Sequence, residues 1–426
     1  MKLKKPALAL ACILALSCSL TSLTACSTEV KAADLTKGIT PANVSGKDAD
    51  ETFALAQTGF ALDLFKTEAA YDGYDNLLLS PLSVSIALSM TANGADNGTL
   101  TEMENVLGLP VQELNDYYVQ YMRGLPSEKN CKLHIADSLW LKDDGQVQVE
   151  KDFLQTNADY YGAPVYKSPF DNQTLTDINN WVKNNTDGMI DKILNDIDDS
   201  AFMYIVNALA FDARWSDVYE KEQVWDGVFT TSDGAEKTVE FLHDTSHYPY
   251  FEDDSAVGFM KSYEGGRYAF AAILPNEDIS LEDYIDGLTA DGLYDMLSGA
   301  EYYETVTSLP KFSYDYDTEL SAQLKQLGMT SAFDISAADF TRLGTPDSPQ
   351  NNIYIGRVLH KTFIAVDELG TKAGAATVVE MLNGSAAPSE PEEKKYVILD
   401  RPFLFMIIDR ETNIPLFIGT VTNPQS

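Results

Sequence analysis

The sequence predicts an α+β fold in which helices dominate the N-terminal half and strands the C-terminal half. Apolar residues recur at helical spacing early in the chain, beginning with Phe53, Ala56 and Phe60. Short apolar runs typical of buried strands lie mainly later in the chain. No Pro/Gly-rich linker divides residues 50–380, so we expect one large domain, although 426 residues would allow two or three.

Five further segments support this expectation. A helix is predicted over residues 83–90, directly after a proline that suits a helix start, and another over residues 177–193. The run at residues 201–210 (AFMYIVNALA) predicts a central strand. Residues 268–274 (YAFAAIL) and 403–408 (FLFMII) predict two more buried strands.

The first 25 residues are typical of an export signal. Three lysines precede an apolar run at residues 7–16, which is too short for a stable membrane span. Residues 23–26 (LTAC) resemble the bacterial lipobox, whose cysteine is diacylated and becomes the new N-terminus. We therefore expect Cys26 to anchor the protein to the membrane, at the bacterial cell surface. A secreted protein is the alternative if the lipobox is not used.

Beyond the signal we expect two regions. Residues 26–47, rich in Ser, Thr, Ala and Lys, predict a tether above the membrane, and residues 48–426 the single folded domain. Only Cys26 and Cys131 remain after cleavage of the signal. A lipidated Cys26 cannot pair, so no internal disulfide is expected, and Cys131 is interpreted as a small buried apolar residue.

The charge excludes one class of partner. The formal net charge is −35, and loss of the three signal lysines leaves 27 basic against 65 acidic residues, or −38. Nucleic-acid binding requires a patch of Lys and Arg, and the sequence offers none. The acidic balance instead favours basic partners.

The sequence contains no convincing catalytic or metal-binding motif. His243 and His247 have the i, i+4 spacing of metal ligands, but the surrounding EFLHDTSHYPYF favours a strand and lacks the glutamate of a zincin. No nucleophile elbow or phosphate-binding loop is present. His360 lies among apolar residues and is interpreted as a core histidine. We expect neither enzymatic activity, nor a metal, nor a cofactor.

One segment stands apart in composition. Residues 370–377 are almost all small, and residues 383–395 (NGSAAPSEPEEKK) are polar and exposed in character. About 28 residues separate the apolar run at 363–366 from the strand predicted from Tyr396. A loop of that length inside a compact domain is uncommon and usually functional.

Residues 366–377 (VDELGTKAGAAT) resemble the hinge of the reactive-centre loop of the serpin family. Further matches follow in the family's order across residues 48–426, about nine-tenths of the chain. They are NLLLSPLS at residues 76–83, Asn207-Ala208 with Phe211 and Trp215, LPKF at 309–312, LGM at 327–329, His360-Lys361, Phe403, LFIG at 416–419 and Asn423-Pro424.

The resemblance implies a serpin fold, with large mixed sheets and an exposed reactive-centre loop at about residues 368–395. It also implies two groups of supporting residues. A hydrogen-bonded shutter beneath the central sheet would consist of Ser80, Ser83, Asn207 and His360. A breach, where that sheet opens, would contain Trp215 and an ion pair between Lys311 and Glu368.

The resemblance further implies an irreversible inhibitor of serine proteases. The target protease cleaves the loop and becomes an acyl-enzyme, and the upstream arm then inserts as a new strand of the central sheet. The hinge residues of that arm would be Glu368, Gly370, Thr371, Ala373, Gly374, Ala375, Ala376 and Thr377. If Thr371 points inward, Ala373, Ala375 and Thr377 follow it, and all are small and uncharged.

The resemblance also implies a position for the scissile bond, because in the family the residue before this bond is usually the seventeenth when the hinge glutamate is counted as the first. Counting from Glu368 gives Gly384 followed by Ser385. The candidate window is Met381, Leu382, Asn383, Gly384, Ser385, Ala386 and Ala387. It contains no Lys or Arg, which argues against trypsin-like targets. Small residues suit an elastase-like pocket, whereas Met381 or Leu382 would suit a chymotrypsin-like one.

Two other functions remain open at this point. A non-inhibitory surface serpin would act as a binding module and form no covalent complex with a protease. A solute-binding or carbohydrate-handling lipoprotein would also agree with the anchor and with the 22 tyrosines, although the hinge pattern argues against it. For the inhibitor, the expected partners are the target serine protease and the membrane, and the expected state is a monomer.

Overall fold

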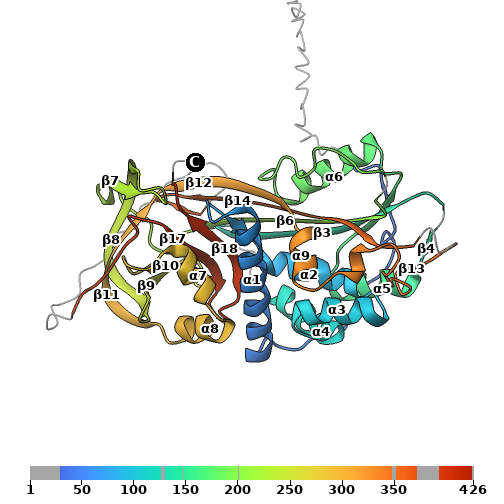
Figure 1. Ribbon diagram of the computed structural model, residues 1–426, viewed down its shortest axis with the longest axis horizontal. Coiled ribbons are helices and arrows are strands. Elements are labelled where there is room, and N and C mark those ends of the chain that lie inside the picture. Colours follow the sequence, from blue (N-terminus) through green and yellow to red (C-terminus); the bar gives the residue numbers. More distant parts are fainter. Residues whose placement is uncertain are drawn as a thin grey trace, which may run out of the picture.

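The computed structural model describes residues 29–125, 130–145, 147–199, 201–347, 352–371 and 393–424. The α+β class expected from the sequence is confirmed (Figure 1). The helices of these residues are α1 (Glu51–Asp72), α2 (Pro81–Ala92), α3 (Asn97–Leu107), α4 (Val111–Gly124), α5 (Lys151–Tyr160), α6 (Asn172–Asn185), α7 (Leu281–Gly287), α8 (Ala290–Ser298) and α9 (Ser321–Gln326).

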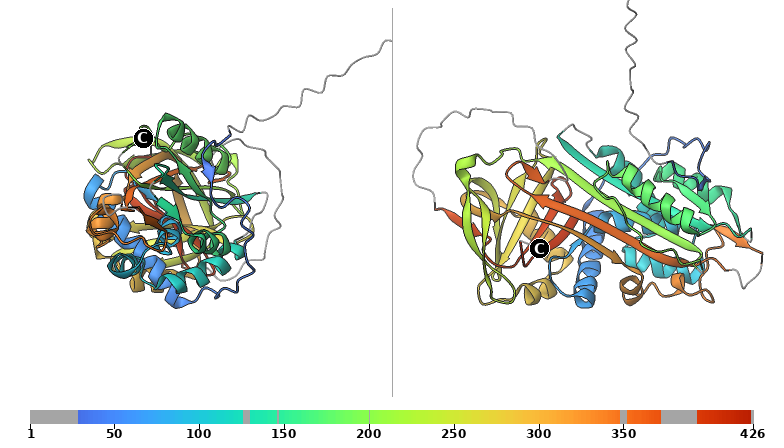
Figure 2. Two further views of the ribbon diagram at one scale, coloured as in Figure 1. Left: turned by 90° about the vertical axis from the view of Figure 1, so that its right-hand side faces the viewer. Right: turned by 90° about the horizontal axis from the view of Figure 1, so that it is seen from above.

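A first large sheet, sheet I, crosses the molecule. In the described residues its strand order is β1 (Ala33–Asp34), β5 (Val165–Ser168), β3 (Cys131–Lys142), β6 (Met203–Arg214), β15 (Gly370–Thr371), β14 (Ile355–Val366) and β12 (Phe312–Glu319). Figure 2 shows its long strands side by side when the molecule is seen from above. Sheet I is mixed, because β6 runs parallel to β14 and antiparallel to β3.

A second large sheet, sheet II, occupies the other end of the molecule (Figure 1). Its described strand order is β16 (Lys395–Ile398), β11 (Glu301–Pro310), β8 (Glu236–Glu252), β9 (Ala256–Ser262), β10 (Tyr268–Pro275), β17 (Phe403–Asp409), β18 (Pro415–Val421) and β2 (Leu78–Leu79), with β7 (Val224–Thr230) on β8. A small sheet pairs β13 (Gly344–Pro346) with β4 (Val147–Val149).

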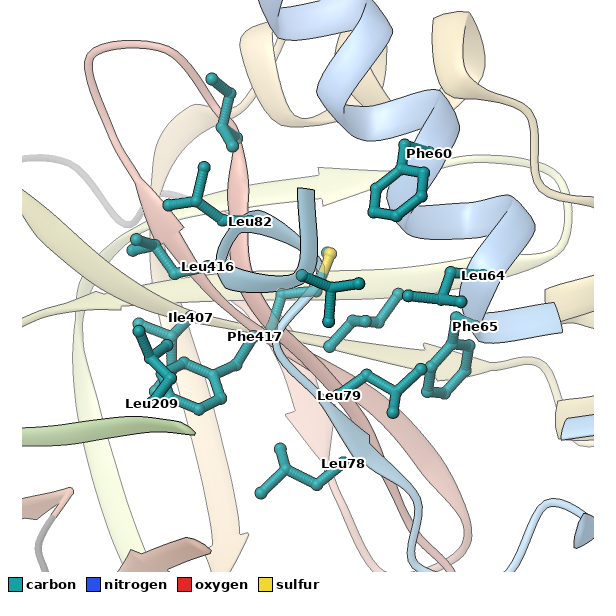
Figure 3. Packing of buried hydrophobic residues seen from close by; sticks show 14 of the residues in the cluster. Phe60, Leu64, Phe65, Leu78, Leu79, Leu82, Leu209, Ile407, Leu416 and Phe417 are labelled. Atoms are coloured by element: carbon teal, nitrogen blue, oxygen red, sulfur yellow. The ribbon is translucent and has the colours of Figure 1, made fainter. Parts of the chain in front are cut away.

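Sheet I is covered on both faces. Helix α6 lies on one face, where Trp140 and Tyr204 of the sheet join Ile178 and Trp181 in one buried cluster. Helix α2 packs on the other face against β3 and β6. Figure 3 shows the main core there, where side chains of α1, β2, β6, β17 and β18 meet. Because β6 is covered on both faces, it is an apolar run that is buried along most of its length without alternation.

The strands expected from apolar runs are present. The run at residues 201–210 forms β6 in the centre of sheet I, and the other two form β10 and β17, neighbours in sheet II. The helix expected over residues 83–90 is α2, which begins with Pro81. Proline suits this position because the first helical N–H groups lack helical partners in any case.

The expected helix over residues 177–193 is wrong at both ends. Helix α6 begins at Asn172 because Asp171 caps it, its carboxylate accepting the backbone N–H groups of Gln173 and Thr174. The helix ends at Asn185, and Asp187 and Gly188 follow with φ of 49° and 78°. Such left-handed residues close a helix, and the apolar spacing alone did not indicate them.

The N-terminal segment packs on the body from residue 31 onward. The backbone N–H groups of Lys31 and Ala32 donate to the buried carboxylate of Asp177 in α6, at 3.0 and 2.8 Å. Strand β1 then extends the edge of sheet I by pairing with β5, and the N–H of Lys47 donates to the carbonyl of Asp116 in α4. The expected signal, including Cys26, lies outside the described residues.

Within the described ranges, no helix combines the length and apolar character needed to cross a bilayer.

Candidate functional site

The candidate site is the boundary between β6 and β14, here called the seam. The two strands pair in parallel from Met203 opposite Ile355 to Leu209 opposite Thr362. Beyond that point they separate, and the chain that follows β14 turns back between them as β15. The first hinge residues therefore already occupy one end of the seam.

A tight turn at residues 367–370 returns the chain into sheet I. The carboxylate of Asp367 accepts the backbone N–H groups of Leu369 and Gly370, at 2.8 and 3.1 Å. Aspartate commonly stabilises turns in this way. Gly370 is required by contact, because a Cβ at this position would lie 2.1 Å from the carbonyl oxygen of Ala213 in β6.

Thr371 points into the core. Its side chain is buried, and its hydroxyl shares a hydrogen bond of 2.5 Å with the hydroxyl of Tyr263. The ring of Tyr263 stacks on that of Trp215, with centroids 4.5 Å apart. The inward direction of Thr371, on which the expected inward direction of Ala373, Ala375 and Thr377 depends, is therefore observed. Those three residues themselves lie outside the described residues.

Three N–H groups of the segment that follows β6 donate hydrogen bonds to the hinge. The indole N–H of Trp215 donates to the carbonyl of Asp367 at 2.9 Å, and its backbone N–H to the carbonyl of Leu369 at 2.9 Å. The backbone N–H of Tyr219 donates to the carbonyl of Glu368 at 3.0 Å. Three consecutive carbonyls of the hinge are thus bound by one short segment, here called the 215–219 clamp.

An ion pair holds the hinge from the other side. The ammonium of Lys311 lies 2.8 Å from the carboxylate of Glu368 and 3.2 Å from that of Glu240. Burial works against the charge of Lys311, but its hydrogen bonds to the two carboxylates outweigh it, so the pKa of Lys311 is raised. Because the pair is partly exposed, its contribution to stability is modest, of the order of 1 kcal/mol or less.

A hydrogen-bonded network crosses the seam beneath the hinge. The backbone N–H of Ser80 donates to Nε2 of His360 at 3.1 Å, so this nitrogen offers its lone pair and the proton of the neutral ring lies on Nδ1. Nδ1 donates to Oδ1 of Asn207 at 2.6 Å, directly across the seam. Burial lowers the pKa of His360 to about 3, which keeps the ring neutral.

The network continues to a buried acid on the neighbouring strand. Nδ2 of Asn207 donates to the hydroxyl of Ser83 and, at 2.5 Å, to Oδ1 of Asp137 in β3. Oδ2 of Asp137 has no hydrogen-bond partner among the described residues. Burial raises the pKa of Asp137 to about 8, against the hydrogen bonds from Asn207 and Ser83. The carboxyl of Asp137 is therefore uncharged at neutral pH.

The structure thus brings together the shutter and breach residues named from the sequence, with one difference. Ser80 contributes its backbone N–H, while its buried hydroxyl has no partner in the described part of the chain. The remaining hinge residues, the scissile-bond window at 381–387 and the loop up to residue 392 lie outside the described residues.

Sequence reasoning missed three members of the site. Tyr263 and the backbone of Tyr219 gave no signal, because their partners lie more than 100 residues away. Asp137 gave a weak signal, as the single acidic residue within strand β3.

His243 and His247 lie on strand β8, and His243 stacks on Trp225 with ring centroids 3.6 Å apart. Cys131 is buried, as expected.

The shutter predicts a specific pH dependence of stability. The pKa of Asp137 is about 8 when folded and 3.8 in its ordinary state, so its stabilising effect is lost as pH rises through 8. His360 has the opposite sign, and its ring still loses protons in the unfolded state just above pH 6.5, but this contribution is the same in the native protein and in Asp137→Asn. Between pH 6.5 and 8 we expect the stability of the native protein to fall relative to Asp137→Asn, by at most about 1.4 kcal/mol per pH unit.

Urea unfolding at several pH values in this range measures the effect. Asp226→Asn, which changes an exposed carboxylate of β7, is the matched control and should keep the native slope. Parallel stability curves for the native protein and Asp137→Asn would contradict an uncharged Asp137.

Comparison with known proteins places the chain in a family. Residues 55–424 match the model of the family described as serpin (serine protease inhibitor). An uncharacterized serpin-like protein of Thermococcus kodakarensis is 31% identical over 382 residues, covering 87% of this chain and 85% of the relative.

Solved structures agree with this match. The native state of the thermophilic serpin tengpin aligns with a TM-score of 0.86 at 47% identity, covering 92% of this chain and 100% of tengpin. The latent state of tengpin aligns with a TM-score of 0.76 at 45% identity, covering 88% and 99%. The chain has the serpin fold and belongs to the serpin family.

Proposed function

We propose that this protein is an irreversible suicide-substrate inhibitor of serine proteases. The single observation that carries the proposal is the position of β15. Thr371 lies buried between β6 and β14, so the strand that insertion would extend has already started. The residues that would follow it inward, Ala373, Ala375 and Thr377, are small and uncharged.

The proposed reaction uses ordinary serine-protease chemistry. The protease serine attacks the carbonyl carbon of Gly384, the peptide bond to Ser385 breaks, and the new amine leaves with a proton. The protease remains joined to Gly384 through an ester. Insertion of the freed arm into the seam then carries the protease away and distorts its active site before water can hydrolyse the ester.

The seam supplies the driving force. Insertion separates β6 from β14 and so breaks the bond between Asn207 and His360, which the described structure holds at 2.6 Å. A new central strand of about a dozen residues gains roughly 10 kcal/mol at ~1 kcal/mol per net hydrogen bond. Insertion also breaks the backbone pairing of β6 with β14 from Met203–Ile355 to Leu209–Thr362. The new strand bonds to β6 on one side and to β14 on the other, so it replaces this pairing and adds a second ladder. The net gain makes insertion favourable once the loop is cut.

The proposed targets are elastase-like or chymotrypsin-like proteases. The window at residues 381–387 contains only small or apolar residues and asparagine. The net charge of −35 and the acidic residues Glu380, Glu390, Glu392 and Glu393 would attract a basic protease.

A non-inhibitory serpin that acts as a surface binding module is the second candidate. It is favoured by the absence of a strong specificity residue in the scissile-bond window, where counting places a glycine. Such a protein would be cleaved or ignored by proteases, and no covalent complex would form.

The first test is a matched pair of hinge variants. The native protein should form an SDS-stable complex with elastase or chymotrypsin. Ala375→Glu would place a charge in the core, and we expect insertion to slow by roughly 100-fold or more, since each ~1.4 kcal/mol is a factor of about ten in rate. The variant would then be cleaved without trapping the protease.

Ala376→Glu is the control, because its side chain would face outward and inhibition should persist. Stoichiometries of inhibition measured over a panel of elastase, chymotrypsin, subtilisin and trypsin compare the three proteins. If no protease of the panel gives a covalent complex with the native protein, the binding-module alternative is favoured. Equal inhibition by both variants would contradict strand insertion.

The second test locates the scissile bond. Mass spectrometry of the protein after incubation with elastase should detect cleavage after Gly384. Cleavage at another bond within residues 381–387 would change the position of the scissile bond but would still support the assignment of this segment as the reactive-centre loop. Cleavage only outside that window would contradict the assignment of the reactive site.

We also propose that the protein is exported and anchored to the bacterial surface by a lipid on Cys26. Labelled fatty acid should be incorporated on expression in a bacterium, and Cys26→Ala should abolish the label and move the protein to the soluble fraction. Cys18→Ala, which changes a second cysteine of the signal region, is the control and should keep the label. Label that persists in Cys26→Ala would rule out this anchor.

A further inference from the structure

A buried lysine lies directly beneath the 215–219 clamp. Lys261 of β9 is only 2% exposed. Its ammonium lies 4.3 Å from the ring centroid of Tyr219, 5.2 Å from that of Tyr248 and 5.8 Å from that of Trp215. It donates a hydrogen bond of 2.9 Å to the hydroxyl of Tyr248. The carboxylates of the described residues that raise its pKa do so through charge alone, without a hydrogen bond to the ammonium.

The charges around Lys261 act from a distance. The hydroxyl of Tyr248 donates to the carboxylate of Asp244 on the same strand, β8, so a tyrosine separates this acid from the ammonium. Asp217, in the clamp itself, is the second acid that favours the cation. The hydroxyl of Tyr219 has no partner among the described residues. Burial lowers the pKa of Lys261 to about 8, and the two acids only partly oppose this fall.

The lysine is connected to solvent. Asp217 is exposed and Asp244 half-buried, and both line a cavity of about 630 Å³ together with Trp215. The hydrogen bonds from Lys261 through Tyr248 to Asp244 therefore reach from the buried ammonium to the surface. Protons can exchange along this path without opening sheet I.

Two of the three rings around Lys261 belong to the residues that bind the hinge. Trp215 and Tyr219 donate to the carbonyls of residues 367–369. A cation attracts the faces of aromatic rings, and the attraction is strongest when the cation is shielded from water. A neutral amine lacks this attraction. The charge of Lys261 therefore acts on the rings of Trp215 and Tyr219, and so on the indole N–H that donates to Asp367. The two backbone N–H groups that bind the hinge belong to the same two residues.

We propose that Lys261 is a positioning residue for the hinge, whose ammonium holds Trp215 and Tyr219 in place and whose deprotonation loosens their grip on residues 367–369. The consequence for the inhibitor rests on the proposed function, because only an inserting hinge makes such control useful. The grip itself exists in the intact protein and is measurable without a protease.

Hydrogen exchange of the full-length protein tests the proposal. The amides of Trp215 and Tyr219 report the clamp directly, and amides of β17 provide an internal reference for global stability. After correction for intrinsic exchange, we expect the protection of both clamp amides to fall with a midpoint near pH 8 in the native protein. The expected fall is about tenfold, which corresponds to ~1.4 kcal/mol.

Lys261→Met removes the charge and keeps an unbranched chain of similar size. It should show the low protection of the alkaline native protein at every pH, while protection in β17 is unchanged. Lys325→Met is the matched control, because Lys325 lies 5.1 Å above the ring of Phe333 at a distance from the clamp, and it should keep the native profile. If Lys261→Met fails to fold, the pH dependence of clamp-amide protection in the native protein, measured relative to the amides of β17, tests the proposal by itself.

Constant protection of both clamp amides across this pH range, or native protection in Lys261→Met, would overturn the proposal. Either result leaves the inhibitory mechanism intact, since that is decided by covalent complexes with the protease panel. Conversely, a loss of clamp protection in a protein that traps no protease would support the role of Lys261 and reject the inhibitor.

Discussion

The structure depends on the parallel pairing of β6 with β14. These strands lie in the middle of a sheet that is covered on both faces, yet they are joined for only part of their length. Beyond Leu209 and Thr362 they separate, and at the far end Gly370 and Thr371 of the following segment lie between them, paired with Ala213, Arg214 and Val366. The seam therefore has a defined starting point for a further strand, and the loop that would supply this strand is attached directly to it.

The groups that hold the seam are polar but carry little charge. His360 is kept neutral by burial and by the N–H of Ser80, and Asp137 is held uncharged by burial. Breaking a neutral hydrogen bond such as that from His360 to Asn207 costs much less than separating a buried ion pair. The charged groups lie instead at the hinge end of the seam, where Lys311 forms an ion pair with Glu368 near solvent. Such a distribution would suit the proposed insertion, in which the seam opens once.

The sequence predicted those parts of the fold that depend on local pattern. Apolar runs identified β6, β10 and β17, and the proline at residue 81 marked the start of α2. The family resemblance identified Asn207, His360, Trp215 and the partners Lys311 and Glu368. Contacts between distant segments were beyond local pattern. Nothing near Lys261 indicates that Tyr219, Tyr248 and Trp215 surround it, and Asp177 gives no sign that it binds residues 31 and 32.

The most direct measurement is the stability of the protein before and after a single cut in the loop at residues 381–387. If the seam is a site for strand insertion, the cut chain completes sheet I, and the midpoint of guanidinium unfolding should rise strongly although a peptide bond has been lost. A cut protein that unfolds at the same or a lower denaturant concentration than the intact one would contradict the account.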